Sequence, residues 1–330
     1  MTLQLQRVLH NFELQGNNLE SSSTMVMNYN GSIKRTRAEP DQEQEAVIFK
    51  KPRVEGSKPE RSVMPYQELS PNYESETRLK MVSGSFYLPK ENELRPQGED
   101  AHFICAEENT IGVADGVGGW ANKGIDSGLY ARELMMNSVM AVHNQHKTSS
   151  GVINPRKVLE EAFSNTKNIQ GSSTACIVTL NKDVLHYANV GDSGFMLFRN
   201  NKCLFRSSTQ QHRFNCPFQL GNAPRSDHPS SATGVPVRVI PGDVIVLGTD
   251  GLLDNMFGRE IEQVLEDKTD EGDVDPEMLA GIIAELALYN SFDRFNPSPF
   301  SVSAKKAGVK HVGGKVDDIT VIVAAIMEES

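Results

Sequence analysis

The order of strand-like and helical segments is the feature that most narrows the fold of this chain. Short runs of β-branched and aromatic residues, broken by Gly, Asn and Asp, predict strands. These runs are 81–88, 102–106, 110–114, 174–180, 184–190, 195–199, 235–240, 244–248 and 319–325. Helical spacing of apolar residues marks 127–146, 155–163, 259–266 and 276–289, with Asn154 and Asp275 as predicted N-caps. The helices come in pairs between blocks of strands, so a doubly wound parallel sheet is disfavoured. We predict an α+β fold, a central antiparallel β-sandwich flanked by helix pairs.

The first 62 residues differ from the rest of the chain. Gln, Asn, Ser, Glu and Lys dominate them without a lasting apolar period, which predicts a disordered tail before one folded domain at 63–330. Basic clusters at 34–37 and 50–53 lie twelve residues apart, as in a bipartite nuclear signal, or are simply solvated charges. We expect a nuclear or cytoplasmic protein. An organellar presequence is less expected, because Glu13 and Glu20 interrupt the segment.

Composition excludes several classes of function. The net charge is −10, and residues 63–330 carry 24 Lys and Arg against 35 Asp and Glu, so nucleic acid is not an expected partner. The longest apolar run, 319–327, is far shorter than the roughly 20 residues of a spanning helix, so no membrane partner is expected. Four scattered cysteines form neither a disulfide framework nor a zinc pattern. We also expect a monomer.

Acidic residues recur at the ends of the predicted strands, each beside a glycine or another small residue. The segments are 98–100, 114–119, 189–193, 248–251 and 316–320. One such Asp is an ordinary turn residue. Five in one domain predict convergence at one sheet edge, where carboxylate and carbonyl oxygens suit Mg²⁺ or Mn²⁺ rather than Zn²⁺.

Clustered carboxylates repel one another, and a pair of divalent ions would relieve the repulsion. Two ions roughly 3.5–4 Å apart can share a carboxylate and a bridging hydroxide that acts as a nucleophile near neutral pH. The expected reaction is hydrolysis of a phosphate ester.

The same motifs, in this order, resemble the metal-dependent protein phosphatase 2C family over about residues 80–326. They are Arg95…Glu99-Asp100-Ala101-His102, Asp115-Gly116-x-Gly118-Gly119, Gly171-Ser172-Ser173-Thr174-Ala175, Gly191-Asp192-Ser193, Thr249-Asp250-Gly251-Leu252 and Asp317-Asp318-Ile319-Thr320-Val321. The Asp-Gly-Val-Gly-Gly-Trp segment is similar to a divergent branch that includes mitochondrial and plant organellar phosphatases. The resemblance implies a serine/threonine phosphatase with two Mn²⁺ or Mg²⁺ ions and phosphoserine or phosphothreonine proteins as substrates.

The resemblance also implies roles for individual residues. Asp115 would bridge both ions, the Gly116 carbonyl would bind one, and Asp250 and Asp317 would ligate directly. Water-mediated or additional-ion roles fall to a second set, Glu99, Asp100, Asp192 and Asp318. Arg95 would bind the substrate phosphate through two guanidinium hydrogen bonds.

Two positions depart from the family pattern. Val117 stands where many members have a histidine proposed as general acid, and the branch resembled here shares that valine. His102, on a predicted strand, and His212, in a loop, are alternative acids, with a structural role favoured for His102. Asp318 replaces the usual Asn, so the better ligand of Asp317 and Asp318 stays open.

Two other functions are compatible with the sequence. One is a catalytically weak or inactive phosphatase-fold scaffold that binds phosphoproteins, and the presence of every expected ligating Asp weighs against it. The other is a different two-metal phosphohydrolase, such as a nuclease or a small-ester phosphatase, and the acidic body disfavours the nuclease.

Overall fold

The computed structural model describes residues 78–329, apart from 94, 149–150 and 270–274. The chain divides into two units, Met1–Ser75 and Glu76–Ser330, and all described residues belong to the second. The predicted tail, its basic clusters at 34–37 and 50–53, and the predicted boundary at residue 63 lie outside the described residues. Within the described part, no helix is both long enough and apolar enough to span a membrane.

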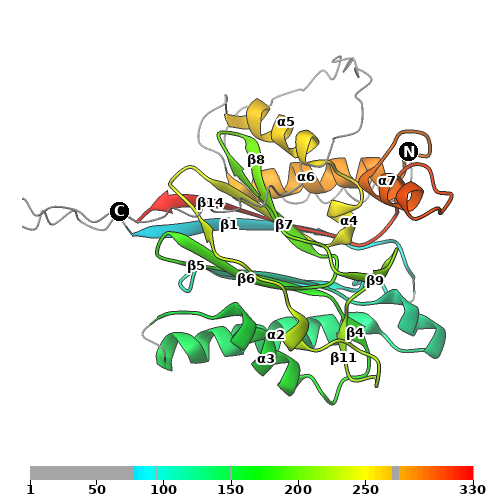
Figure 1. Cartoon of the computed structure of the whole chain (residues 1–330), viewed down its shortest axis with the longest axis horizontal. Helices are drawn as coiled ribbons and strands as arrows, with labels where there is room; N and C mark the ends of the chain where they lie inside the picture. Colours follow the sequence, from blue (N-terminus) through cyan, green and yellow to red (C-terminus); the bar gives the residue numbers. More distant parts are fainter. Residues whose placement is uncertain (1–77, 94, 149–150, 270–274, 330) are drawn as a thin grey trace, which may run out of the picture. The chain divides into compact units, whose positions relative to one another are not determined.

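Two five-stranded sheets form the centre of the described unit, and their strands pair antiparallel throughout. One sheet has the order β1 (Leu79–Leu88), β14 (Ile319–Glu328), β13 (Val244–Gly248), β7 (Gly194–Arg199) and β8 (Lys202–Arg206). The other has the order β12 (Val237–Arg238), β6 (Val184–Val190), β5 (Ala175–Asn181), β3 (Thr110–Asp115) and β2 (Asp100–Cys105). Figure 1 shows the two sheets facing each other.

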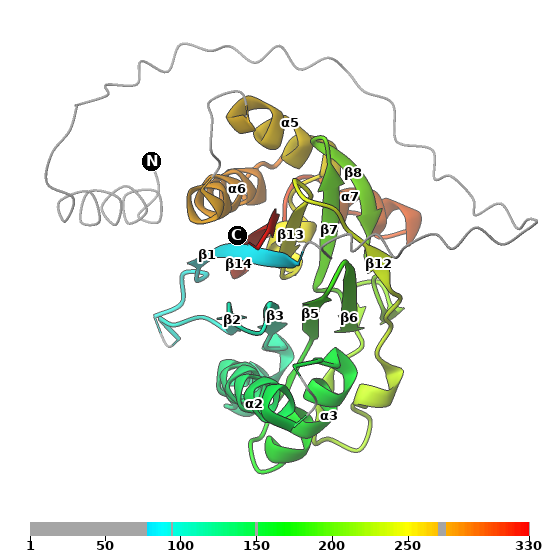
Figure 2. The same cartoon turned by 90° about the vertical axis from the view of Figure 1, so that its left-hand side faces the viewer.

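Helices cover both outer faces of this sandwich (Figure 2). α2 (Ser127–Thr148) and α3 (Pro155–Asn165) pack on the β2–β3–β5–β6 sheet, while α5 (Gly258–Thr269) and α6 (Pro276–Ser291) lie on the side of the other sheet. The predicted caps are confirmed: the Asn154 side chain accepts from the backbone N–H groups of Arg156 and Lys157, and that of Asp275 accepts from Glu277. The predicted antiparallel sandwich with flanking helix pairs is therefore confirmed.

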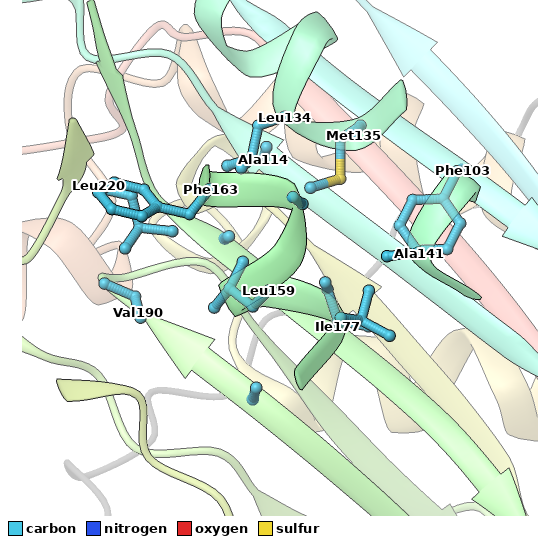
Figure 3. Packing of buried hydrophobic residues seen from close by; sticks show 14 of the residues in the cluster. Phe103, Ala114, Leu134, Met135, Ala141, Leu159, Phe163, Ile177, Val190 and Leu220 are labelled. Atoms are coloured by element: carbon cyan, nitrogen blue, oxygen red, sulfur yellow. The ribbon is translucent and has the colours of Figure 1, made fainter. Parts of the chain in front are cut away.

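Two apolar layers hold the unit together. Between the sheets lie buried side chains such as Ile111, Val178 and Ile322. A second cluster joins α2 and α3 to the sheet that they cover, and it includes Leu134, Leu159, Ile177 and Val190 (Figure 3). Each fully buried aliphatic side chain stabilises the fold by roughly 1.5–3 kcal/mol, so these layers hold the strand ends in fixed positions.

Several short elements are additional to the predicted ones. They are η1 (Gly118–Lys123), β4 (Ser172–Ser173), β9 (Gln211–Arg213), β10 (Cys216–Pro217), β11 (Leu220–Gly221), η2 (Pro229–Ser231), α4 (Asp250–Leu253) and α7 (Pro299–Lys306). The edge strand β8 was also not predicted, because its largely exposed residues lack apolar alternation. The predicted strand at 235–240 was too long, since only Val237 and Arg238 pair with β6.

Candidate metal centre

The acidic motifs come together because the ends of neighbouring strands carry them. Asp100 begins β2 and Asp115 ends β3, and the two residues are direct partners in the antiparallel register. In the other sheet, Gly248 of β13 pairs with Gly194 of β7 and with Val321 of β14. Asp192 precedes β7, Asp250 follows β13 and Asp317 precedes β14, so these three carboxylates meet at the same sheet end.

Three buried carboxylate oxygens in this cluster have no hydrogen-bond partner in the part of the chain that the structure describes. They are the Oδ1 atoms of Asp100, Asp192 and Asp250. The other oxygen of Asp100, Oδ2, accepts from the hydroxyls of Thr249 (2.8 Å) and Thr320 (2.7 Å). Buried acceptors without donors are costly, by roughly 1–3 kcal/mol each, and a bound cation is one way to satisfy them. The donor set therefore fits a hard divalent ion.

The charges of the cluster perturb one another. Burial, and then the neighbouring charges of Asp250 and Asp100, raise the pKa of Asp115 well above its usual value. Burial and Asp250 likewise raise the pKa of Asp192 to about 7, although Gln211 donates to its Oδ2 at 2.9 Å. Asp250, Asp100, Asp317 and Asp192 all oppose the ionisation of Asp115. Added positive charge would therefore stabilise the ionised carboxylates at this end of the sandwich.

A lysine side chain lies among these carboxylates. The ammonium of Lys315 contacts Oδ2 of Asp250 and is 3.0 Å from Oδ2 of Asp254 and 3.2 Å from Oδ2 of Asp317. Burial opposes the charged form, but the three carboxylates outweigh it and raise the pKa of Lys315 well above its usual value. Among the described residues, no three Asp, Glu, His or Cys side chains are arranged as a ready ligand set.

Asp317 and Asp318 have different surroundings. Asp317 faces the cluster, where Lys315 and Lys90 (2.9 Å) outweigh the effect of burial and lower its pKa. Asp318 instead accepts from the backbone N–H groups of Lys90 (2.7 Å) and Glu99 (3.1 Å) and lies 3.3 Å from the hydroxyl of Tyr87. Asp317 thus pairs with the two lysine side chains at the cluster, while Asp318 holds the segment before β2 through backbone hydrogen bonds.

Arg95 and Glu99 form one unit at the edge of the cluster. The guanidinium of Arg95 pairs with Oε1 of Glu99 and donates to the carbonyl of Ile125 at 2.7 Å. Ser127 donates its hydroxyl to the same Glu99 oxygen at 2.7 Å. Arg95 is therefore held beside Glu99 rather than against Asp115, Asp250 or Asp317.

The loop after Asp115 is fixed by close backbone packing. The Asp115 carbonyl accepts from the backbone N–H of Thr174 and from the hydroxyl of Ser173, both within the predicted Gly-Ser-Ser-Thr motif. Gly116 donates its N–H to the Glu99 carbonyl at 3.0 Å, and a Cβ at Gly116 would lie 2.6 Å from the Ser127 carbonyl. Only glycine fits here, which explains the Asp-Gly pair.

The two histidines considered as acids have other partners. His102 lies 3.0 Å from the Ser85 hydroxyl, and burial lowers its pKa. His212 pairs with Asp227 at 2.9 Å and stacks on Phe218 with ring centres 4.2 Å apart. Each imidazole ring therefore already has a polar side-chain partner, Ser85 for His102 and Asp227 for His212.

Sequence reasoning missed three charged members of the site, Lys90, Asp254 and Lys315. Asp254 carried a usable signal, because it follows Asp250 by four residues, one helical turn. Lys315 stands two residues before Asp317, but nothing in its sequence context indicates that its side chain turns toward the acidic residues.

Comparison with known proteins is consistent with this geometry. Residues 84–217 match the model of the family Protein phosphatase 2C. The chain is 42% identical over 251 residues to the protein phosphatase PTC7 homolog fig of Drosophila mojavensis, covering 78% of that protein. The chain belongs to the protein phosphatase 2C family.

Other members of the protein phosphatase 2C family extend the likeness. The probable protein phosphatase 2C 55 of Arabidopsis thaliana is 50% identical over 248 residues, which are 75% of this chain and 52% of the relative. This chain thus spans about half the length of that plant relative. Among solved structures, the photosystem II phosphatase PBCP superposes with a TM-score of 0.67 at 32% identity, over 74% of this chain and 98% of that one.

Proposed function

We propose that this chain is a metal-dependent serine/threonine protein phosphatase. The observation that carries the proposal is the set of three buried, unpartnered carboxylate oxygens on Asp100, Asp192 and Asp250, at the strand ends that bear the phosphatase 2C motifs. The relatives named above are protein phosphatases, which supports phosphoserine and phosphothreonine proteins as the substrates.

The residues of the cluster divide into two groups toward two Mn²⁺ or Mg²⁺ ions. Asp115, the Gly116 carbonyl, Asp250 and Asp317 would hold the ions directly. Water-mediated contacts and an additional ion would fall to a second group, Glu99, Asp100 and Asp192. Such ions supply Lewis acidity and an activated water for attack on phosphorus. A neighbour in fold, the phosphatase PstP, has a structure in complex with 2 manganese ions.

Other side chains orient these oxygens. Thr249 and Thr320 hold one oxygen of Asp100 and leave its second oxygen for the cluster. Ser127 and Arg95 hold Glu99 in place. Arg95, 14% exposed and next to Glu99, is proposed to bind the substrate phosphate, because a guanidinium can donate two parallel hydrogen bonds to it.

The test is phosphate release from a phosphothreonine peptide by the full chain, in EDTA and in Mn²⁺ or Mg²⁺. We expect release only with a divalent ion and a loss of at least about 100-fold in Asp115→Asn and in Asp250→Asn. Asp183→Asn is the matched control, because Asp183 is an exposed Asp that pairs with Arg238 away from the cluster. Metal-independent release, or equal activity of all three variants, would contradict the proposal.

We also propose a nuclear or cytoplasmic location, based on the basic clusters at 34–37 and 50–53, and a monomeric state. A fluorescent reporter fused to residues 1–62 should accumulate in nuclei, and an evenly distributed reporter would refute the nuclear signal. Light scattering on the full chain should give about the monomer mass of 36.4 kDa.

A further inference from the structure

The Lys315 side chain contacts three carboxylates of the cluster, yet none of the roles proposed so far involves it. Its ammonium touches Asp250, Asp254 and Asp317, so one positive charge faces three carboxylates. The side chain is only 17% exposed and passes 5.4 Å from the centre of the Phe300 ring. Such a buried, desolvated arrangement leaves little room for water to screen these charges.

The backbone of Lys315 is fixed in place by a buried asparagine. Oδ1 of Asn255 accepts from the Lys315 N–H at 2.9 Å, and Nδ2 of Asn255 donates to the Lys315 carbonyl at 2.8 Å. Asn255 is 1% exposed and its amide also donates to the Gly251 carbonyl, next to Asp250. The clamp therefore sets Lys315 at a defined distance from the segment that carries Asp250 and Asp254.

Lys315 contacts two of the carboxylates proposed to hold the ions. Two of its three partners, Asp250 and Asp317, are residues assigned above to direct metal contact, and the third, Asp254, is not. Lys315 holds Oδ2 of Asp250 and Oδ2 of Asp317, while Oδ1 of Asp250 has no partner among the described residues. A divalent ion on these two carboxylates would therefore lie within a few ångströms of the ammonium, and the two cations would repel each other. Asp254 remains available to the ammonium when an ion binds.

We propose that Lys315 is a tethered counter-ion that neutralises the carboxylate centre in the metal-free protein and withdraws to Asp254 when ions bind. This inference rests on the proposed function for the identity of the metal ligands. The lysine stabilises the empty centre and, for the same reason, lowers its affinity for metal, since each ion must first displace it. Lys315 thereby sets the metal concentration that the enzyme requires, although it would not bind an ion itself.

The experiment measures Mn²⁺ binding by isothermal titration calorimetry, and thermal unfolding in EDTA, on the full chain. Lys315→Gln removes the charge at similar length, and Lys315→Arg retains it. Lys202→Gln is the matched control, because Lys202 is 64% exposed and pairs with Glu262 and Glu266, which are not part of the cluster. We expect Lys315→Gln to bind Mn²⁺ about tenfold more tightly and to unfold at a lower temperature in EDTA, as removal of a close buried charge predicts.

Lys315→Arg should remain within about threefold of the wild-type affinity. Lys202→Gln should bind Mn²⁺ as tightly as the wild type, because the ion pairs of Lys202 are exposed and do not involve the cluster. Equal or weaker Mn²⁺ binding by Lys315→Gln would overturn the inference, since a purely structural lysine changes stability without raising affinity. A wild-type chain that binds Mn²⁺ but releases no phosphate would contradict only the proposed function. A wild-type chain that binds no Mn²⁺ would overturn both.

Discussion

Asp317 and Asp318 are adjacent and chemically identical, but the structure predicts opposite effects when each is changed to asparagine. Asp318 accepts the N–H groups of Lys90 and Glu99, and Asp318 itself is 4% exposed. An amide at this position keeps one acceptor and turns an NH₂ group toward the other backbone donor. Within the described residues, the Asp317 carboxylate pairs with the ammonium groups of Lys90 and Lys315 and accepts a backbone N–H only from its neighbour Asp318.

The magnitude follows from the lost acceptor. A buried donor left without a partner costs about 1–3 kcal/mol, and a charged acceptor is stronger than a neutral one, so Asp318→Asn should lose about 2 kcal/mol of stability. In a domain of roughly 250 residues this lowers the unfolding temperature by about 4–8 °C. Asp317→Asn should cost less than about 1 kcal/mol, because Lys315 keeps Asp250 and Asp254 and Lys90 stays partly solvated.

The affinity for metal should change in the opposite order, with the larger effect in Asp317→Asn. We expect Asp317→Asn to weaken Mn²⁺ binding by more than about tenfold, since an amide is a poorer ligand for a hard cation, and Asp318→Asn to change it little. Calorimetric unfolding in EDTA and Mn²⁺ titration of both variants measure the two effects. The reasoning is refuted if Asp318→Asn loses the metal while Asp317→Asn loses stability.

Three further predictions concern the same region. Gly98→Ala should lower the unfolding temperature by several degrees, because Gly98 has a φ of +69° and a Cβ would clash with the Tyr87 hydroxyl and the Asp318 carboxylate; unchanged calorimetric unfolding would argue against this packing. His102→Gln should reduce the loss of stability on acidification: burial lowers the folded pKa of His102, so its contribution is present at neutral pH and is lost as pH falls below the unfolded value. Urea unfolding of both proteins between pH 5 and 8 tests this, and parallel pH profiles would disprove it. Removal of divalent ions with EDTA should lower the unfolding temperature of the wild type, and a temperature independent of Mn²⁺ concentration would contradict the metal centre.

Local rules made much of the fold predictable. Pro155 and Pro276 at the first helical positions, each after a capping side chain, marked two helix starts correctly. Buried strands such as β5 and β13 have continuous apolar runs, so their period and length identify them. The exposed edge strand β8 has no such pattern, because its pairing depends on β7 rather than on its own residues.

Sequence features pointed to most of the acidic residues that the structure brings together, but not to Asp254, Lys90 or Lys315. Glycine neighbours and strand ends marked Asp100, Asp115 and Asp250, since those features are local in sequence. The place of Lys315 depends on the Asn255 clamp, which joins residues sixty positions apart. The distinct surroundings of Asp317 and Asp318 depend on contacts with Lys90 and Glu99, more than 200 positions away.

The position of β14 has a consequence for the order in which this molecule is made. β14 contains residues 319–328 but lies inside its sheet, between β1 and β13, and pairs with both over most of their length. During synthesis, the edge strand β1 has no partner in this sheet until these residues leave the ribosome, and Asp317 emerges just before them. A nascent or prematurely terminated chain therefore lacks a sheet strand and a carboxylate at the same moment. Incomplete copies would be recognisable to quality-control proteases as unfolded rather than persist as partly active enzymes.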